Sequence, residues 1–209
     1  MVLRIQSELG ANCRKTPERS AWLEHLPDVL RKLEHVWALT PDAPLDGEEP
    51  SCSYVSAVLS ANGTPAVLKI PMPHMEAEHE IHGLRFWCGN PTVRLLRADG
   101  DSGAMLLERC KPGTTLRILE ESEQDVVISS LLRRLWRLPS TPHPFRPLSA
   151  LTEYWSNETL AHAERWPDAG LVREGLRLFK SCHAMPSKIP RDGLRCAHGL
   201  PVDEPCWLG

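Results

Sequence analysis

The chain has 209 residues and a formal net charge of -3 at pH 7, and 42% of its residues are hydrophobic. This composition is typical of a globular protein, and it excludes a general electrostatic attraction to nucleic acid. No apolar run approaches the roughly 20 residues of a membrane span, and residues 1–15 lack the apolar centre of a signal peptide. We therefore expect a cytoplasmic protein with neither a membrane nor a nucleic-acid partner.

The first half of the chain is predicted to contain helices and strands in alternation. Apolar residues at helical spacing indicate a helix over 20–38, with Ser20 as its cap and a break at Pro27. Strands are predicted at 52–60 and 65–70, joined by a turn at Asn62-Gly63. A helix over 75–88 follows, and then two strands at 92–99 and 103–110 around a second turn.

From residue 119 onward the apolar residues recur only at helical spacing, which predicts helices over 120–138, 147–165 and 169–184. The predicted fold class is therefore α+β, with a small antiparallel sheet followed by a helical lobe. We expect one lobe at 1–110, a linker at 111–118 and a helical lobe at 119–209.

Lys69 lies within an otherwise apolar predicted strand, between a loop that could cover a ligand and a helix that carries several acids. A lysine is a point-charge ligand for phosphate when a carboxylate holds it in place. The alternative is an edge-strand lysine whose ammonium group reaches water.

Several runs of residues in the first lobe together resemble the aminoglycoside/hydroxyurea antibiotic resistance kinases, which have a protein-kinase-like fold. They read NGTPAVLK at 62–69, EAEHE at 76–80, LRFW at 84–87, VRLLRAD at 93–99, LLER at 106–109 and PG at 112–113. The resemblance covers residues 20–185 and is densest between 52 and 116. It implies ATP- and Mg²⁺-dependent phosphorylation of a hydroxyl group on an aminoglycoside such as streptomycin, or on hydroxyurea.

The resemblance also implies roles for single residues. Lys69 would contact the phosphates of ATP, and Glu80 would pair with it, with Glu78 as the second choice. The hinge that binds adenine through its backbone would be Glu108, Arg109 and Cys110. The turn over the phosphates would be Ser51, Cys52 and Ser53, although the glycines of the family are mostly missing there.

The catalytic loop of the family, HGDxHxxN, is not matched in this chain. His198-Gly199 fits its first two residues, but Leu200 stands at the position of the aspartate, and no metal-binding asparagine or aspartate follows. An internal deletion or a frameshift near codon 199 is our hypothesis for this truncated helical lobe. Asp203 is a weak candidate for the missing base, and Asp192 lies upstream. The second hypothesis for function is a catalytically dead remnant that still binds nucleotide.

Other clusters have simpler explanations. The seven cysteines form no CxxC pair, which indicates free thiols in a reducing compartment. Cys182, His183, Cys196, His198 and Cys206 do not have the regular spacing of a zinc site. The basic run 131–137 is read as a helix with solvated arginines. The resemblance implies that acids of the helical lobe receive a cationic substrate, and the candidates are Glu153, Glu158 and Glu164.

Overall fold

The structure is a computed structural model that describes residues 5, 7–43, 45 and 51–183. The chain divides into two compact units, Met1–Pro144 and Phe145–Gly209, and each is described by itself. The boundary that we placed at 111–118 from the sequence stays a prediction.

The first unit begins with two helices, α1 (Ser7–Cys13) and α2 (Pro17–Trp37). The cap of α2 is Thr16, whose side chain accepts a hydrogen bond from the Arg19 amide at 3.3 Å, so the predicted cap at Ser20 was wrong. The predicted break at Pro27 was also wrong, because α2 runs straight through this residue. Burial of Leu26 and Leu30 on the adjacent turns stabilises the helix there against the loss of one backbone hydrogen bond.

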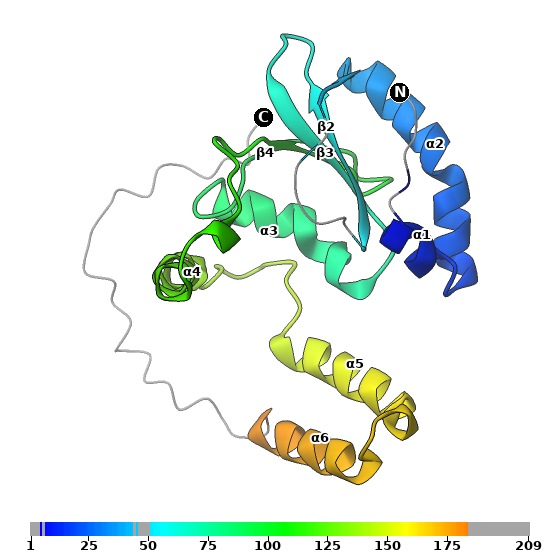
Figure 1. Cartoon of the computed structure of the whole chain (residues 1–209), viewed down its shortest axis with the longest axis vertical. Coiled ribbons are helices and arrows are strands. Elements are labelled where there is room, and N and C mark those ends of the chain that lie inside the picture. The colour runs from blue at the N-terminus through cyan, green and yellow to red at the C-terminus, as the bar shows by residue number, and fades with distance from the viewer. Residues whose placement is uncertain (1–4, 6, 44, 46–50, 184–209) are drawn as a thin grey trace. The chain divides into compact units, whose positions relative to one another are not determined.

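Five antiparallel strands form one sheet in the order β1-β2-β3-β5-β4 (Figure 1). They are β1 (Thr40–Pro41), β2 (Ser53–Leu59), β3 (Pro65–Pro71), β4 (Leu95–Ala98) and β5 (Met105–Glu108). The two predicted hairpins are confirmed, and Gly63 has the positive φ of 77° that the first turn requires. The short strand β1 was not among the predicted strands, because two residues with a proline carry no strand signal.

The helix predicted over 75–88 is present in two parts. A 3₁₀ segment, Met75–His79, precedes the α-helix α3, Glu80–Trp87. His74 caps the 3₁₀ segment, since its Nδ1 accepts a hydrogen bond from the Ala77 amide at 3.2 Å. The change in helix type places Glu80 at the start of α3, where a carboxylate also interacts favourably with the helix dipole.

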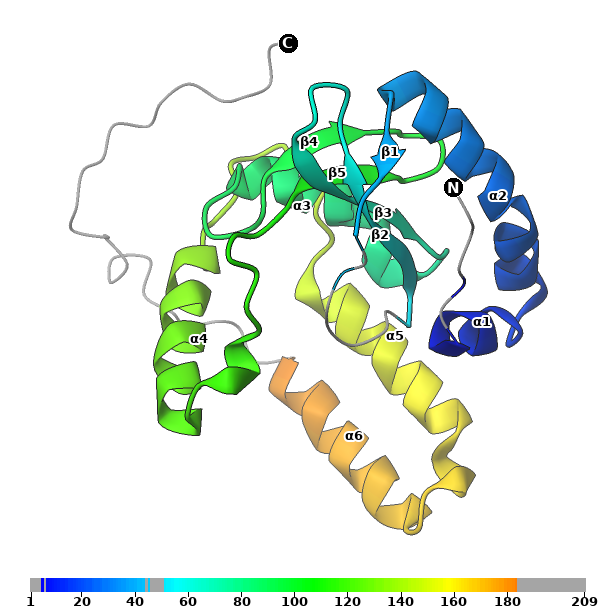
Figure 2. The same cartoon turned by 45° about the horizontal axis from the view of Figure 1, so that its top comes forward.

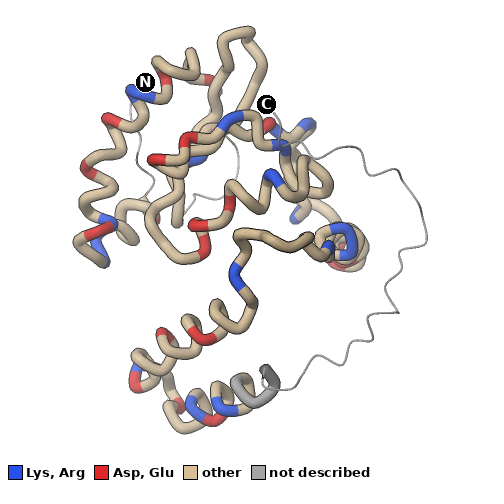
Figure 3. The backbone as a smooth tube through the Cα atoms, turned by 180° about the vertical axis from the view of Figure 1, so that it is seen from behind, with Lys and Arg blue, Asp and Glu red and all other residues tan. Residues whose placement is uncertain are grey.

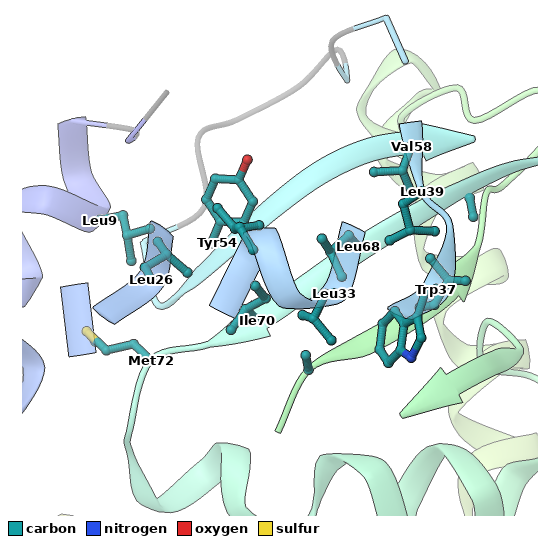
Figure 4. Packing of buried hydrophobic residues seen from close by; sticks show 14 of the residues in the cluster. Leu9, Leu26, Leu33, Trp37, Leu39, Tyr54, Val58, Leu68, Ile70 and Met72 are labelled. Atoms are coloured by element: carbon teal, nitrogen blue, oxygen red, sulfur yellow. The ribbon is translucent and has the colours of Figure 1, made fainter. Parts of the chain in front are cut away.

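The main core of this unit lies between α2 and one face of the sheet (Figures 2 and 4). Its largest members come from α1, α2 and the central strands, and include Leu9, Leu26, Leu33, Leu68 and Ile70, each no more than 1% exposed. Val36 is one of the apolar residues at helical spacing in the helix predicted over 20–38, but in α2 it is 59% exposed. Helical spacing predicts which side of a helix carries its apolar residues. Only the packing of the helix against the sheet determines which residues at the margin of that side are buried.

After β5 a short 3₁₀ segment, Leu116–Ile118, leads to helix α4, Glu121–Leu135. The helix carries acids in its first turn and arginines in its last turn, which complements its dipole (Figure 3). Its end is attached to the end of α3, because the Trp87 indole donates to the Leu135 carbonyl at 3.1 Å.

The second unit contains α5 (Leu148–Ala161), a 3₁₀ segment (Ala163–Arg165) and α6 (Ala169–His183). The Asp168 side chain accepts a hydrogen bond from the Leu171 amide at 2.8 Å and so caps α6. The predicted helical stretches 147–165 and 169–184 are confirmed, with a 3₁₀ turn at the end of the first. Among the residues that the structure describes, no helix has the length and hydropathy needed to cross a membrane.

Candidate functional site

Lys69 lies near the centre of the sheet, on β3, between two buried neighbours. Leu68 and Ile70 point into the core on the α2 face, at 0% and 1% exposure. Because side chains alternate along a strand, Lys69 projects from the opposite face. Its side chain is 26% exposed, so it is neither a core residue nor a freely solvated lysine of an edge strand.

Glu80, the first residue of α3, forms an ion pair with Lys69 through Oε1 and Nζ. The Glu80 side chain is 28% exposed, so most of both side chains is removed from water. Glu78, the second choice from the sequence, is an exposed residue of the preceding 3₁₀ segment. The structure thus brings together the lysine and the glutamate that the sequence selected, while their roles toward a nucleotide stay predictions.

The strand register defines an apolar surface next to Lys69, which we call the Lys69 face. Lys69 is paired with Val55 on one side and with Met105 on the other, and the next row toward the β2–β3 turn is Ala57, Val67 and Leu107. Ala57, Met105 and Leu107 are buried. Sequence reasoning missed this surface. Side chains alternate along a strand, so Val67, two residues before Lys69, could have been assigned to the same face.

Glu108, the first predicted hinge residue, uses its side chain within the fold. Its Oε1 accepts a hydrogen bond from the Arg94 amide at 2.7 Å, and its own amide donates to the Arg94 carbonyl at 3.0 Å. These two contacts fix the point where β5 ends. Cys110, the last predicted hinge residue, is exposed.

Arg109, the middle hinge residue, forms an ion pair with Asp42 just beyond β1. The distance from Nη1 to Oδ2 is 2.7 Å, and the side chains are 29% and 23% exposed. Asp42 is a site residue that sequence reasoning missed. Its loop has several acids, and nothing in the sequence distinguishes one of them as the partner of a residue 67 positions away.

Main-chain carbonyls attach the segment predicted to cover the phosphates to α1 and to the residue that follows β3. The Ser51 carbonyl accepts a hydrogen bond from the Asn12 side chain at 2.9 Å, and the Cys52 carbonyl accepts one from the Met72 amide at 3.0 Å. Ser53 is the first residue of β2 and is 7% exposed, so it belongs to the strand.

The shifted pKa values of this unit belong to groups on or near the α2 side of the sheet. Hydrogen bonds from Ser102, with a smaller effect of Lys32, hold the pKa of Asp99 below its usual range. Burial raises the pKa of Tyr54, and burial likewise raises that of the Cys13 thiol. Cys13 is therefore an unreactive core thiol in this environment.

Most of the remaining predicted site residues fall beyond the part of the chain that the structure describes. Asp192, Leu200, Asp203 and the candidate zinc ligands beyond 183 lie outside the described residues. So do the side chains of Cys182 and His183. In the described part of the chain, no group of three or more histidine, cysteine or acidic side chains could hold a metal ion.

The three acids proposed to receive a cationic substrate are all exposed in the second unit. Glu153 and Glu158 lie on α5, and Glu164 forms an ion pair with Arg173 of α6. Their role toward a cationic substrate stays a prediction.

Comparison with known proteins agrees with this geometry. The sequence model of the aminoglycoside/hydroxyurea antibiotic resistance kinase family matches residues 36–188. The chain is 41% identical to a streptomycin 6-kinase of Streptomyces glaucescens over 143 residues, which are 66% of this chain and 46% of that protein. It is 31% identical to a hydroxyurea phosphotransferase of Kitasatospora aureofaciens over 180 residues, which are 85% of this chain and 51% of that protein.

A streptomycin 6-kinase of Streptomyces griseus is 38% identical over 126 residues, or 60% of this chain and 40% of that protein. No solved structure matches the chain. A lysine on a central strand with its helix glutamate is an arrangement that protein kinases use to bind nucleotide phosphates. The chain belongs to the aminoglycoside/hydroxyurea antibiotic resistance kinase family. It spans about half the length of the curated relatives that it matches.

Proposed function

We propose that the first unit binds ATP on the Lys69 face and that the protein transfers the terminal phosphoryl group to a hydroxyl of a small antibiotic. The acceptor would be an aminoglycoside such as streptomycin, or hydroxyurea, as the names of the relatives indicate. Such a reaction belongs in the cytoplasm, where ATP is supplied. The contact between Lys69 and Glu80 is the observation that carries the proposal.

The described residues fit the nucleotide. Lys69 supplies a fixed positive charge for the phosphates. Glu80 holds the Lys69 ammonium group in place and uses only part of its three N–H donors, so the others are available to a phosphate. Val55 and Val67 of the Lys69 face are only partly buried and offer an apolar contact to the base, and the backbone at 108–110 lies at the end of the adjacent strand β5. The residues that carry each task therefore come from β2, β3, β5 and α3.

The described residues do not fit a magnesium ion in the same way, since they include no cluster of metal ligands. Magnesium remains part of the proposal through the family alone, and we assign no step to it. The base that would accept the proton of the acceptor hydroxyl is likewise not among the described residues.

A second candidate function is nucleotide binding without transfer. The sequence favours it at one point, because Leu200 stands where the family loop has an aspartate. A carboxylate at that position would orient the acceptor hydroxyl and take its proton, and a leucine can do neither.

The experiment is phosphate transfer from labelled ATP by the purified chain, with streptomycin and hydroxyurea as separate acceptors. The Lys69→Met variant is the control, and equilibrium binding of a fluorescent ATP analogue is measured in parallel. Acceptor-dependent transfer that is lost in the variant supports the kinase. Nucleotide binding without transfer supports the second candidate. Absence of both activities in the wild-type chain would refute the proposal.

A further inference from the structure

Asp42 and Arg109 form a contact that crosses the sheet. Asp42 follows β1, and its amide donates to the Ala57 carbonyl of β2 at 3.2 Å. Arg109 follows β5, which is separated from β1 by both β2 and β3. Neighbouring strands are about 4.8 Å apart, so roughly 14 Å of sheet lies between the ends of β1 and β5. The two side chains nevertheless meet at 2.7 Å.

The pair lies on the same face of the sheet as Lys69. On the α2 face, the positions next to this row are filled by core residues such as Val58 and Ala66, at 1% and 0% exposure. The row that runs from Asp42 to Leu107 passes over Ala57 and Val67, which belong to the Lys69 face. The Arg109–Asp42 contact therefore crosses the Lys69 face over the row next to Lys69.

The Asp42 carboxylate is oriented by a second contact within its own loop. Its Oδ1 accepts a hydrogen bond from the Ala43 amide at 2.8 Å, which leaves Oδ2 for the guanidinium group. Isolated surface ion pairs are worth little, because two flexible side chains must be ordered. Here the carboxylate is already oriented and both side chains are mostly removed from water, so the pair is a stronger restraint than an ordinary surface pair.

We propose that Asp42 and Arg109 form a clasp over Ala57 and Val67, and that the base of a purine nucleoside triphosphate packs on the outer face of its guanidinium group. This inference rests on the proposed nucleotide site. With the phosphates at Lys69 and the base near the backbone of 108–110, the base would lie against the outer side of the Arg109 guanidinium group. That group is planar and permanently charged, and it packs well on an aromatic ring. Both members of the clasp are positioning residues.

The clasp is tested by the affinity of the purified chain for a fluorescent ATP analogue. We expect Asp42→Asn to raise the half-saturating concentration about three- to tenfold, since one partly buried ion pair is lost. The matched control is Asp101→Asn. Asp101 is 94% exposed and its ion pair with Lys32 is a long contact of 3.9 Å, so the same substitution is made at a weak surface pair. The control should bind like the wild type, and the thermal midpoint of Asp42→Asn should fall by only about 2–4 °C, which leaves the chain folded at the assay temperature.

Exchange of the two charges, with Asp42→Arg and Arg109→Asp together, should recover part of the lost affinity, because it restores an ion pair at the same place and shows that the pairing itself is required. Arg109→Gln is the second variant if Asp42→Asn does not fold. An Asp42→Asn affinity within twofold of the wild type would overturn the clasp.

The Lys69→Met variant separates this inference from the proposed function. If the wild type binds, Lys69→Met does not and Asp42→Asn is unchanged, the clasp alone fails. If the wild-type chain does not bind the analogue at all, both are overturned.

Discussion

The ion pair between Lys69 and Glu80 leads to a quantitative prediction that does not depend on nucleotide. Replacing Glu80 by glutamine keeps the size and polarity of the side chain but removes its charge. Two unit charges at 4 Å interact by about 1 kcal/mol in water and by about 4 kcal/mol at an effective dielectric constant of 20. The exposed fractions of the side chains, 26% and 28%, place this pair between those limits. After the cost of ordering both side chains, we expect a coupling free energy of about 1 kcal/mol.

The assay is a double-mutant cycle on the free energy of unfolding. Wild type, Lys69→Met, Glu80→Gln and the double variant are unfolded in urea and followed by tryptophan fluorescence, for which Trp37 in the core is a suitable probe at 8% exposure. The matched control is the same cycle with Glu78→Gln, because Glu78 is an exposed acid two residues earlier. Its coupling with Lys69 should be below about 0.3 kcal/mol, at the low end of the range for exposed charge pairs.

The outcome that would refute the reasoning is equal coupling of Lys69 with Glu78 and Glu80, or no coupling with either. In that case the helix start would not determine which carboxylate holds the lysine. A larger coupling for Glu80 in low salt, partly screened in high salt, is the expected pattern for a pair at this degree of exposure.

Three further predictions concern the packing of the first unit. Leu33→Ala should lower the free energy of unfolding by about 3 kcal/mol, whereas Val36→Ala on the exposed side of the same helix should change it by less than about 0.5 kcal/mol; urea unfolding measures both. Ser102→Ala should cost about 1 kcal/mol at pH 7, because its hydroxyl donates to Asp99 at 2.5 Å. Since the pKa of Asp99 is lowered in the folded protein, this stabilisation is fully present above about pH 4 and is lost as the pH falls through the folded pKa. Unfolding curves at stepped pH should therefore show the difference between wild type and variant shrinking as the pH is lowered below about 4. Trp87→Phe removes the indole donor that holds the end of α4, so hydrogen exchange in the last turn of α4 should become faster while exchange in β3 stays unchanged.

The sequence was sufficient for those features that depend on local periodicity or on a single turn. Alternating strands around Asn62-Gly63 indicated the central hairpin, because few dipeptides adopt the required turn so readily. The position of Lys69 within an apolar strand, with acids on the following helix, was enough to predict that a helix carboxylate pairs with it, whereas its role as a phosphate ligand stays a prediction. The choice of Glu80 over Glu78 also followed from the sequence, through the residue pattern of the family.

The tertiary structure decided the features that join distant parts of the chain. Asp42 and Arg109 are 67 positions apart, and only the order β1-β2-β3-β5 shows that their contact must cross the Lys69 face. Helix α2 continues through Pro27 because burial on the adjacent turns outweighs the local preference for a break, and local preference is all that a sequence pattern measures. Sequence periodicity determined which residues are apolar and how they are spaced, whereas the packing of α2, the sheet and α3 determined which of them became core and which became the candidate site.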